Sequence, residues 1–371
     1  GIEKSFDYEL TTSNKPLKLS LDTEIQYLIR EELLKFQEIF NSYGSTAILM
    51  NVNSGEIISM VSLPDFDLNK REDISDKKFI NRSTKGVYEL GSVFKTFTLA
   101  AGLQQNVIQE DTLFKNLPKK IKCAGRSISE YDMDIPSSLT AEEILIRSGN
   151  IGSIKIAQKV GLENFKDFLE NLDLLNKIQF DIEEVGNPIP FKWGKCKLAT
   201  SAYGHGITTT PLQLAKAYAI IANGGYKIKP TLIKKEKNLK RGEQIITQEN
   251  SNKINEILRK IVTSEQGTAN LANIAGYEIA GKTGTAQKSI KGKYSKKKIN
   301  TFASIFPISS PKYVLIVLLD EPKLSETYIY EYNDGKKRKI IGTPFNTAGW
   351  TSVEVAKNII EKIGPILAIK Y

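Results

Sequence analysis

The strand-like segments of this chain lie near its two ends, and this placement limits the possible folds more than any other feature. Residues 45–50 and 56–62 are apolar runs on either side of Asn53-Ser54-Gly55, whose side chains suit a tight connection, so they predict a β-hairpin. Three further strands are predicted late in the chain, over residues 277–287, 301–306 and 313–319. A sheet built from these segments combines the start of the chain with its end.

The long stretch between these strands has mainly helical periodicity. Polar residues suited to capping precede several apolar segments, most clearly in Thr140-x-x-Glu143, which matches a capping box, and in Thr210-Pro211. An amphipathic helix with Asp22 or Thr23 at its start precedes the first hairpin. The predicted helices cover residues 21–40, 92–103, 141–147, 151–160 and 252–262, together with one that begins at Pro211 and one near the C-terminus.

This order of elements predicts an α+β fold, in which an antiparallel sheet is covered by helices and adjoins an all-helical lobe. We assign residues 1–18 to an N-terminal linker remnant and residues 19–371 to one domain, with the lobe, about residues 64–270, inserted between sheet strands. A chain of 371 residues, 40% of them apolar, can bury a core of that size.

The net charge of +10 is compatible with nucleic acid, an anionic membrane or an anionic polymer as a partner. We favour a lysine-rich solvated surface and no nucleic-acid partner, because the densest run, residues 288–298, is predicted to be an exposed loop between strands. The longest apolar runs, such as residues 313–319, are far shorter than the roughly 20 residues that span a bilayer. Since the chain begins at Gly1 without a signal-like segment, we expect a soluble piece that lacks any export signal or membrane anchor.

The two cysteines and the single histidine are weak candidates for chemistry. Cys123 and Cys196 can pair only if the fold brings their Cα atoms within roughly 7 Å, and we expect them to be unpaired. A zinc site of the HExxH type is excluded, because His205 is the only histidine. It lies in the glycine-rich stretch 203–206, where we expect a structural role rather than that of a general base.

A serine and a lysine offer another route to nucleophilic catalysis. Ser92 and Lys95 are three residues apart in a predicted helix, which places the amine on the same face as the hydroxyl. The lysine must be neutral to accept a proton, so its pKa has to be lowered by burial or by a neighbouring cation. Alone, this spacing is also compatible with an ordinary capped helix.

Two later segments complete a possible site. In Ser148-Gly149-Asn150, Gly149 permits a sharp turn between two predicted helices, so that the flanking polar side chains can point into a cleft. In Lys282-Thr283-Gly284-Thr285, strand alternation puts Lys282 and Gly284 on one face, a cation beside a gap where a substrate backbone can lie. Each segment alone is weak evidence for a site. The occurrence of the serine-lysine pair and these two segments in this order is far harder to attribute to chance.

The three motifs, in this order, are those of β-lactamases and penicillin-binding proteins, with Gly149 in place of the middle Asp of the second motif. The chain resembles the class B penicillin-binding proteins from residues 19–22 to residues 348–350, including blocks at residues 53–60, 209–215 and 266–269. The resemblance implies a penicillin-binding protein transpeptidase fold, similar to that of β-lactamases.

The resemblance also implies a role for each motif residue. Ser92 is the nucleophile that is acylated, Lys95 is its general base, and Ser148 and Asn150 relay protons and hold the substrate amide, while Lys282 supports the electrostatics. Thr283 and Gly284 complete the third motif, Thr285 helps to bind the terminal carboxylate, and the backbone amides of Ser92 and Thr285 form the oxyanion hole. The resemblance implies no metal or organic cofactor.

The implied activity is a peptidoglycan DD-transpeptidase that cross-links D-Ala-D-Ala stem peptides through a serine ester and is acylated by β-lactams. Residues 347–350 resemble the septal, cell-division type more than the elongation type. The family implies a position on the periplasmic face of the inner membrane, an N-terminal anchor helix absent from this chain, and division proteins with a glycosyltransferase as partners. A β-lactamase is disfavoured because no E-x-x-L-N segment is present, whereas a DD-carboxypeptidase, a β-lactam sensor and a divisome scaffold stay open as alternatives.

Overall fold

Five strands form the central sheet of the protein. The computed structural model describes residues 1–67, 69–70, 76–123, 125–235, 241–290, 292–333 and 337–371. The strand order is β2-β1-β9-β8-β7, and every neighbouring pair is antiparallel. The bounds of these strands are β1 (Gly44–Asn51), β2 (Ile57–Leu63), β7 (Ala280–Ile290), β8 (Lys293–Phe306) and β9 (Tyr313–Asp320). The hairpin from the start of the chain therefore joins the later strands through the β1–β9 pair, as in Thr46 opposite Leu318.

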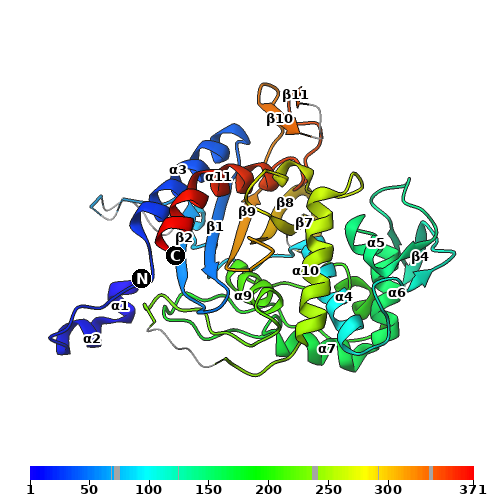
Figure 1. The fold of residues 1–371 in the computed structure, drawn as a ribbon, viewed down its shortest axis with the longest axis horizontal. Coiled ribbons are helices and arrows are strands. Elements are labelled where there is room, and N and C mark those ends of the chain that lie inside the picture. Colours follow the sequence, from blue (N-terminus) through cyan, green and yellow to red (C-terminus); the bar gives the residue numbers. More distant parts are fainter. Residues whose placement is uncertain (68, 71–75, 124, 236–240, 291, 334–336) are drawn as a thin grey trace.

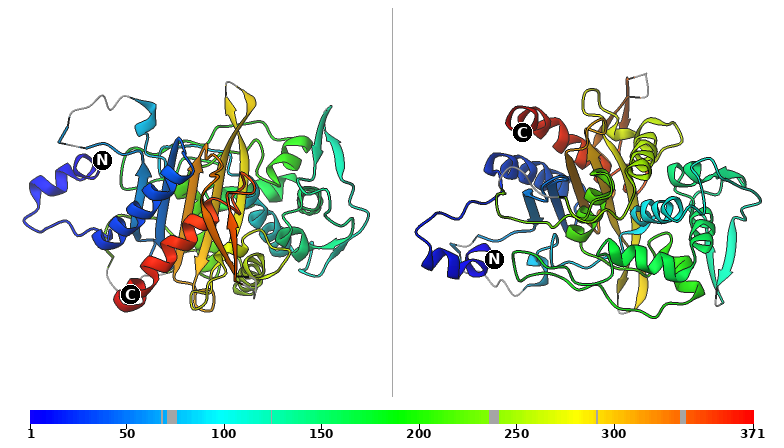
Figure 2. Two further views of the ribbon diagram at one scale, coloured as in Figure 1. Left: turned by 90° about the horizontal axis from the view of Figure 1, so that it is seen from above. Right: turned by 60° about the horizontal axis from the view of Figure 1, so that its bottom comes forward.

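Helices cover both faces of this sheet. Helices α3 (Thr23–Ile39) and α11 (Ser352–Lys370) lie together on one face, and α9 (Pro211–Ala222) packs on the other (Figures 1 and 2). All eight residues of β9 are buried as a result, which explains why its sequence is apolar throughout instead of alternating.

The helical lobe lies beside β7, at the edge of the sheet (Figure 1). Its helices are α4 (Lys95–Gln104), α5 (Ala141–Ile146), α6 (Asn150–Val160), α7 (Leu162–Asn171), α8 (Lys195–Ser201) and α10 (Gln248–Thr263). The remaining elements are α1 (Ile2–Ser5), α2 (Asp7–Thr12), the 3-10 helices η1 (Lys77–Phe79), η2 (Gly91–Phe94) and η3 (Asn270–Ala272), and three small antiparallel pairs, β3 (Leu113–Phe114) with β6 (Leu139–Thr140), β4 (Lys120–Cys123) with β5 (Arg126–Ser129), and β10 (Ile329–Asn333) with β11 (Lys337–Ile341).

Local capping explains where several helices begin. The Asp22 side chain accepts hydrogen bonds from the first amides of α3, and complete capping boxes start α5 at Thr140 and α9 at Thr210. The predicted α+β fold, with an antiparallel sheet covered by helices, is confirmed. Helices α1 and α2 bury no residue, and the division of the chain at residue 18 stays a prediction.

The described residues of the lysine-rich run 288–298 are mostly exposed, as we predicted, but they do not form a loop. Strand β7 continues to Ile290 and β8 begins at Lys293, so the run forms the end of a β-hairpin, with residue 291 outside the described part of the chain. Lys288 Nζ lies 2.7 Å from Asp320 Oδ1, and Lys297 Nζ lies 2.7 Å from Glu321 Oε2. Lysine has little intrinsic preference for β-strands. The ion pairs to Asp320 and Glu321 offset this and help to hold these lysines in β7 and β8.

The expectation of unpaired cysteines was also wrong. Cys123, the last residue of β4, forms a disulfide with Cys196 of α8, and their Cα atoms are 5.6 Å apart. The partners are 73 residues apart in sequence, so only the tertiary fold brings them together. The disulfide fastens the β4–β5 hairpin to the helical lobe.

Among the described residues, we find no helix with both the length and the apolar character needed to cross a bilayer.

Candidate active site

Ser92 lies in a 3-10 turn that two glycines hold against the sheet. The predicted helix over residues 92–103 begins as η2, and α4 follows from Lys95, so Ser92 and Lys95 lie one turn apart. Gly91 has φ +62° and lies between Gly204 and Thr285: a Cβ on Gly204 would come within 1.9 Å of the Gly91 carbonyl oxygen. Only backbones without side chains can approach so closely, and the half-buried Ser92 is thereby fixed beside β7.

The third motif lies on β7, directly against the segment that precedes Ser92. A Cβ on Gly284 would lie 2.1 Å from the carbonyl oxygen of Leu90 and 3.0 Å from Val93. The gap for a substrate backbone that we predicted beside Lys282 is therefore filled by the protein itself. Gly284 instead allows β7 to pack against the Ser92 turn.

Two buried lysines converge on the hydroxyl of Ser148. Lys95 is 2% exposed, and its Nζ donates to the Ser148 carbonyl oxygen at 2.5 Å, to Asn150 Oδ1 at 2.7 Å and to Ser148 Oγ at 3.2 Å. Lys282 is fully buried, and its Nζ donates to Ser148 Oγ at 2.9 Å. Tertiary contacts thus bring together four predicted site residues, Lys95, Ser148, Asn150 and Lys282. In the sequence they are separated by up to 187 positions.

Burial changes the protonation of both lysines. It lowers the pKa of Lys95 to about 7, against the opposing charge of Glu130. Burial also lowers the pKa of Lys282 well below its usual value, and the neighbouring charge of Lys95 adds to this shift. A substantial fraction of Lys95 is therefore neutral at pH 7 and able to accept a proton.

We predicted that Gly149 would form the sharp turn of the second motif, but the turn is at Ser148. Ser148 has φ +58°, in the left-handed region, whereas Gly149 has φ −66° and an extended conformation. A non-glycine residue in this region costs roughly 1–2 kcal/mol. The hydrogen bonds from Lys95 and Lys282 to Ser148 accompany this conformation and direct its Oγ between the two amines.

The two threonines of the third motif are anchored by segments far away in sequence. Thr283 Oγ1 lies 2.7 Å from Thr268 Oγ1, and Thr285 Oγ1 accepts a hydrogen bond from the Ala348 amide at 2.9 Å. Thr285 is half-buried, so part of it faces solvent beside the Ser92 turn. The blocks at residues 266–269 and 348–350 thus support the strand that carries the third motif.

His205 belongs to a cluster around Glu89. Its ring stacks on Tyr294, with centroids 4.5 Å apart, and its Nδ1 lies 3.7 Å from Glu89 Oε2. Glu89 also accepts hydrogen bonds from the Gly206 amide at 2.8 Å and from Tyr294 Oη at 3.0 Å. These contacts agree with a structural part for the histidine in holding residues 203–206 near the turn that leads to Ser92.

One residue of this neighbourhood was missed in the sequence. Glu130 is 7% exposed and accepts hydrogen bonds from the backbone amides of Asn150 and Ile151. Asp132 and Asp134, which follow it closely, are both exposed, and no local pattern distinguishes the three acidic residues. Only its hydrogen bonds to the start of α6 distinguish Glu130 from the two aspartates, and these are visible only in the folded structure.

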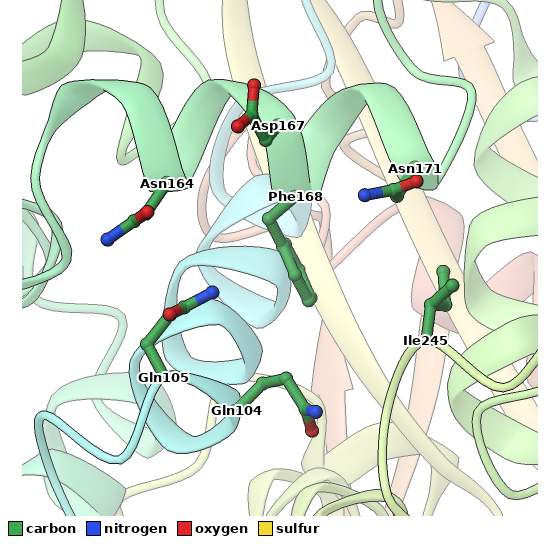
Figure 3. A pocket seen from close by; sticks show the side chains of 7 residues that line it. All are labelled: Gln104, Gln105, Asn164, Asp167, Phe168, Asn171 and Ile245. Atoms are coloured by element: carbon green, nitrogen blue, oxygen red, sulfur yellow. The ribbon is translucent and has the colours of Figure 1, made fainter.

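Two hollows of the surface lie away from the two buried lysines. Figure 3 shows one between α7 and the end of α4, lined by polar side chains such as Gln104, Asn164 and Asn171 around the ring of Phe168. It includes none of the predicted site residues. Within the described ranges, no group of three or more His, Cys, Asp or Glu side chains is arranged to hold a metal ion.

Comparisons with known proteins show what this chain is similar to. The family model described as "Penicillin binding protein transpeptidase domain" matches residues 45–346. The "Probable peptidoglycan D,D-transpeptidase FtsI" of Caulobacter vibrioides is 32% identical over 100% of this chain and 62% of its own length. The "Peptidoglycan D,D-transpeptidase FtsI" of Escherichia coli is 30% identical over 84% of this chain and 53% of its own length.

A solved structure has the same fold. The apo transpeptidase domain of penicillin-binding protein 3 from Burkholderia pseudomallei superimposes with a TM-score of 0.80 and 25% identity, covering 95% of this chain and 97% of that domain. The chain spans about half to three fifths of the length of the two curated relatives, so the match concerns one part of those proteins.

Proposed function

Because the chain belongs to the penicillin-binding protein transpeptidase domain family, we propose that it is a peptidoglycan DD-transpeptidase that acts through an acyl-enzyme on Ser92. The observation that carries this proposal is the convergence of two buried lysines on Ser148 Oγ, of which Lys95 lies one turn after the half-buried Ser92. A basic amine beside a hydroxyl nucleophile, in a site with no histidine base, is what serine acyl transfer by a lysine base requires.

In the first half of the reaction, Ser92 Oγ attacks the carbonyl carbon of the penultimate D-Ala and gives its proton to the neutral amine of Lys95. The backbone amides of Ser92 and Thr285 stabilise the oxyanion. Each donor of this kind typically lowers the free energy of the transition state by about 3–4 kcal/mol. The C–N bond to the terminal D-Ala then breaks, and the leaving amine receives a proton by way of Ser148 Oγ, which is within hydrogen-bonding distance of both lysines.

In the second half, an amine from a neighbouring stem peptide attacks the ester carbonyl. The amine loses a proton to the same relay, the ester C–O bond breaks, and Ser92 Oγ is protonated again. The product is a new peptide bond, and no electrons are exchanged with a cofactor. Lys282 donates a hydrogen bond to Ser148 Oγ and so supports the negative charge that develops there. Thr285 binds the substrate beside β7, while Thr283 and Gly284 hold that strand against its neighbours.

We place this activity in septal wall synthesis on the periplasmic face of the inner membrane. The two relatives named FtsI and the resemblance of residues 347–350 to the division type support this role. The proposal includes an anchor helix outside this chain, division proteins and a glycosyltransferase as partners, and β-lactams as covalent inhibitors. The disulfide between Cys123 and Cys196 agrees with an oxidising compartment such as the periplasm.

The decisive experiment is intact-protein mass spectrometry after incubation with benzylpenicillin, followed by peptide mapping of the adduct. The unmodified chain should gain one penicilloyl group on Ser92, and Ser92→Ala should gain none. Ser310→Ala, which changes an exposed serine in the turn between β8 and β9, is the matched control and should be acylated normally. A chain that leaves the antibiotic intact and unbound would refute the proposed site.

A second assay separates transpeptidation from its close alternatives. A D-Ala-D-Ala stem peptide is supplied with and without an acceptor amine, and the products are resolved by chromatography. Cross-linked product supports the proposal, release of D-Ala with hydrolysed peptide alone indicates a DD-carboxypeptidase, and acylation by penicillin without any peptide turnover indicates a sensor or scaffold.

A further inference from the structure

Glu130 is a buried carboxylate with no ion-pair partner among the residues that the structure describes. It follows β5 directly and is 7% exposed. A buried carboxylate is costly unless hydrogen bonds replace its lost hydration. Both of its oxygens are used in this way, and both face the second motif.

The two oxygens of Glu130 accept from the first two amides of α6. Asn150 N lies 2.6 Å from Oε2, and Ile151 N lies 2.8 Å from Oε1. These amides have no partner within the helix, and a negative charge at a helix N-terminus is stabilised by its dipole. A single side chain therefore fixes the direction in which α6 leaves the Ser148 turn.

The side chain of Asn150 is fixed by the same segment. Its Nδ2 donates to the Ser129 carbonyl oxygen at 2.9 Å, which leaves Oδ1 directed at Lys95 Nζ, 2.7 Å away. Residues 129 and 130 thus hold both the backbone and the amide of Asn150. The segment itself is held in place, since β5 pairs with β4 and β4 is fastened by the disulfide at Cys123.

Glu130 also acts on Lys95 through its charge. Burial lowers the pKa of Lys95 to about 7, and the negative charge of Glu130 opposes that shift. Burial lowers the pKa of Lys282, on β7, and the neighbouring charge of Lys95 lowers it further. Removing the Glu130 charge alone should therefore make Lys95 easier to deprotonate.

We propose that Glu130 is a positioning residue of the acylation site, which orients the Ser148-Gly149-Asn150 turn against Lys95 through the first two amides of α6. The inference rests on the proposed function, since its effect is read out as acylation of Ser92. It assigns the role to a side chain outside the three motifs, 20 positions before Asn150.

The test measures the second-order rate constant of acylation by a fluorescent penicillin as a function of pH. In Glu130→Gln, one oxygen is replaced by an NH2 group, so only one of the two amides keeps its acceptor. We expect the plateau rate constant to fall roughly tenfold to a hundredfold, as for loss of a hydrogen bond to a charged group. The midpoint of the profile should also move below its wild-type value.

Two further variants separate positioning from a general loss of stability. Glu130→Asp keeps the charge but is one methylene shorter, so its rate constant should fall while its midpoint stays near that of the wild type. Glu143→Ala is the control for stability, because Glu143 caps the start of α5 through the Thr140 amide at 2.8 Å, and Ala removes that acceptor from a helix other than α6. It should lower the melting temperature and leave both the rate constant and the midpoint unchanged.

The outcomes distinguish the inference from the function on which it rests. A lower rate constant with a lower midpoint in Glu130→Gln supports positioning of the site. A wild-type rate constant, or a lower melting temperature with an unchanged midpoint, would overturn it. If the wild-type chain is not acylated at all, the proposed function fails first.

Discussion

The pKa of Lys95 predicts how acylation of Ser92 depends on pH. Lys95 has a pKa of about 7 in the folded protein, against 10.5 for an ordinary lysine. If the neutral amine is the base, the rate constant follows its neutral fraction, which is about one tenth at pH 6, half at pH 7 and nine tenths at pH 8. Acylation should therefore be about tenfold faster at pH 8 than at pH 6 and change little above pH 8.

The measurement is the second-order rate constant of acylation by a fluorescent penicillin, from about pH 5.5 to 9.5. Circular dichroism at each pH confirms that the chain stays folded, and Ser92→Ala gives the background. Repeating the profile in Lys282→Met assigns the titrating group: a titration that persists belongs to Lys95, and its midpoint should lie at or above the wild-type value because a neighbouring amine has been removed. A rate constant that continues to rise about tenfold per pH unit between pH 7 and 9 would refute the reasoning, because it would indicate a lysine with an ordinary pKa.

Three other predictions concern the supports of the site. Cys123→Ser should lower the free energy of unfolding by about 4 kcal/mol, the chain-entropy value for a loop of 73 residues, as measured by urea denaturation without reductant. Gly284→Ala should abolish acylation and lower the melting temperature, because its Cβ would meet the Leu90 carbonyl at 2.1 Å; Gly194→Ala, whose Cβ would meet no atom within 4 Å, should behave as wild type in both assays. Ser148→Ala should slow acylation at least about tenfold, since it removes the hydroxyl to which both lysines donate, and an unchanged rate constant would exclude Ser148 from the proton relay.

The parts of the fold that follow from local sequence were predicted well. A capping box requires two side chains three positions apart, so Thr140 and Glu143 mark the start of α5, and Pro211 after Thr210 marks the start of α9, without any knowledge of tertiary structure. The apolar runs of β1, β2 and β9 are equally local. Their assembly into one antiparallel sheet followed from the order of elements along the chain.

Features that depend on distant partners escaped prediction. The disulfide joins residues 73 positions apart. Lysines of the β7–β8 hairpin form ion pairs with Asp320, the last residue of β9, and with Glu321, which follows it. The left-handed conformation of Ser148 and the role of Gly284 in close packing also depend on neighbours that no short motif specifies. The motifs indicated which residues meet in the site, whereas tertiary contacts decide how each one is oriented.

The pairing of β1 with β9 has a consequence for how the chain reaches its folded state. The paired residues, such as Thr46 and Leu318, are about 270 positions apart, so the central sheet can close only after nearly the whole chain is available. Lys282 and Thr285 join the sheet through β8, which itself needs β9 as its neighbour. The cluster of Lys95, Ser148 and Lys282 is thus assembled late, and a chain that ends before β9 cannot form it.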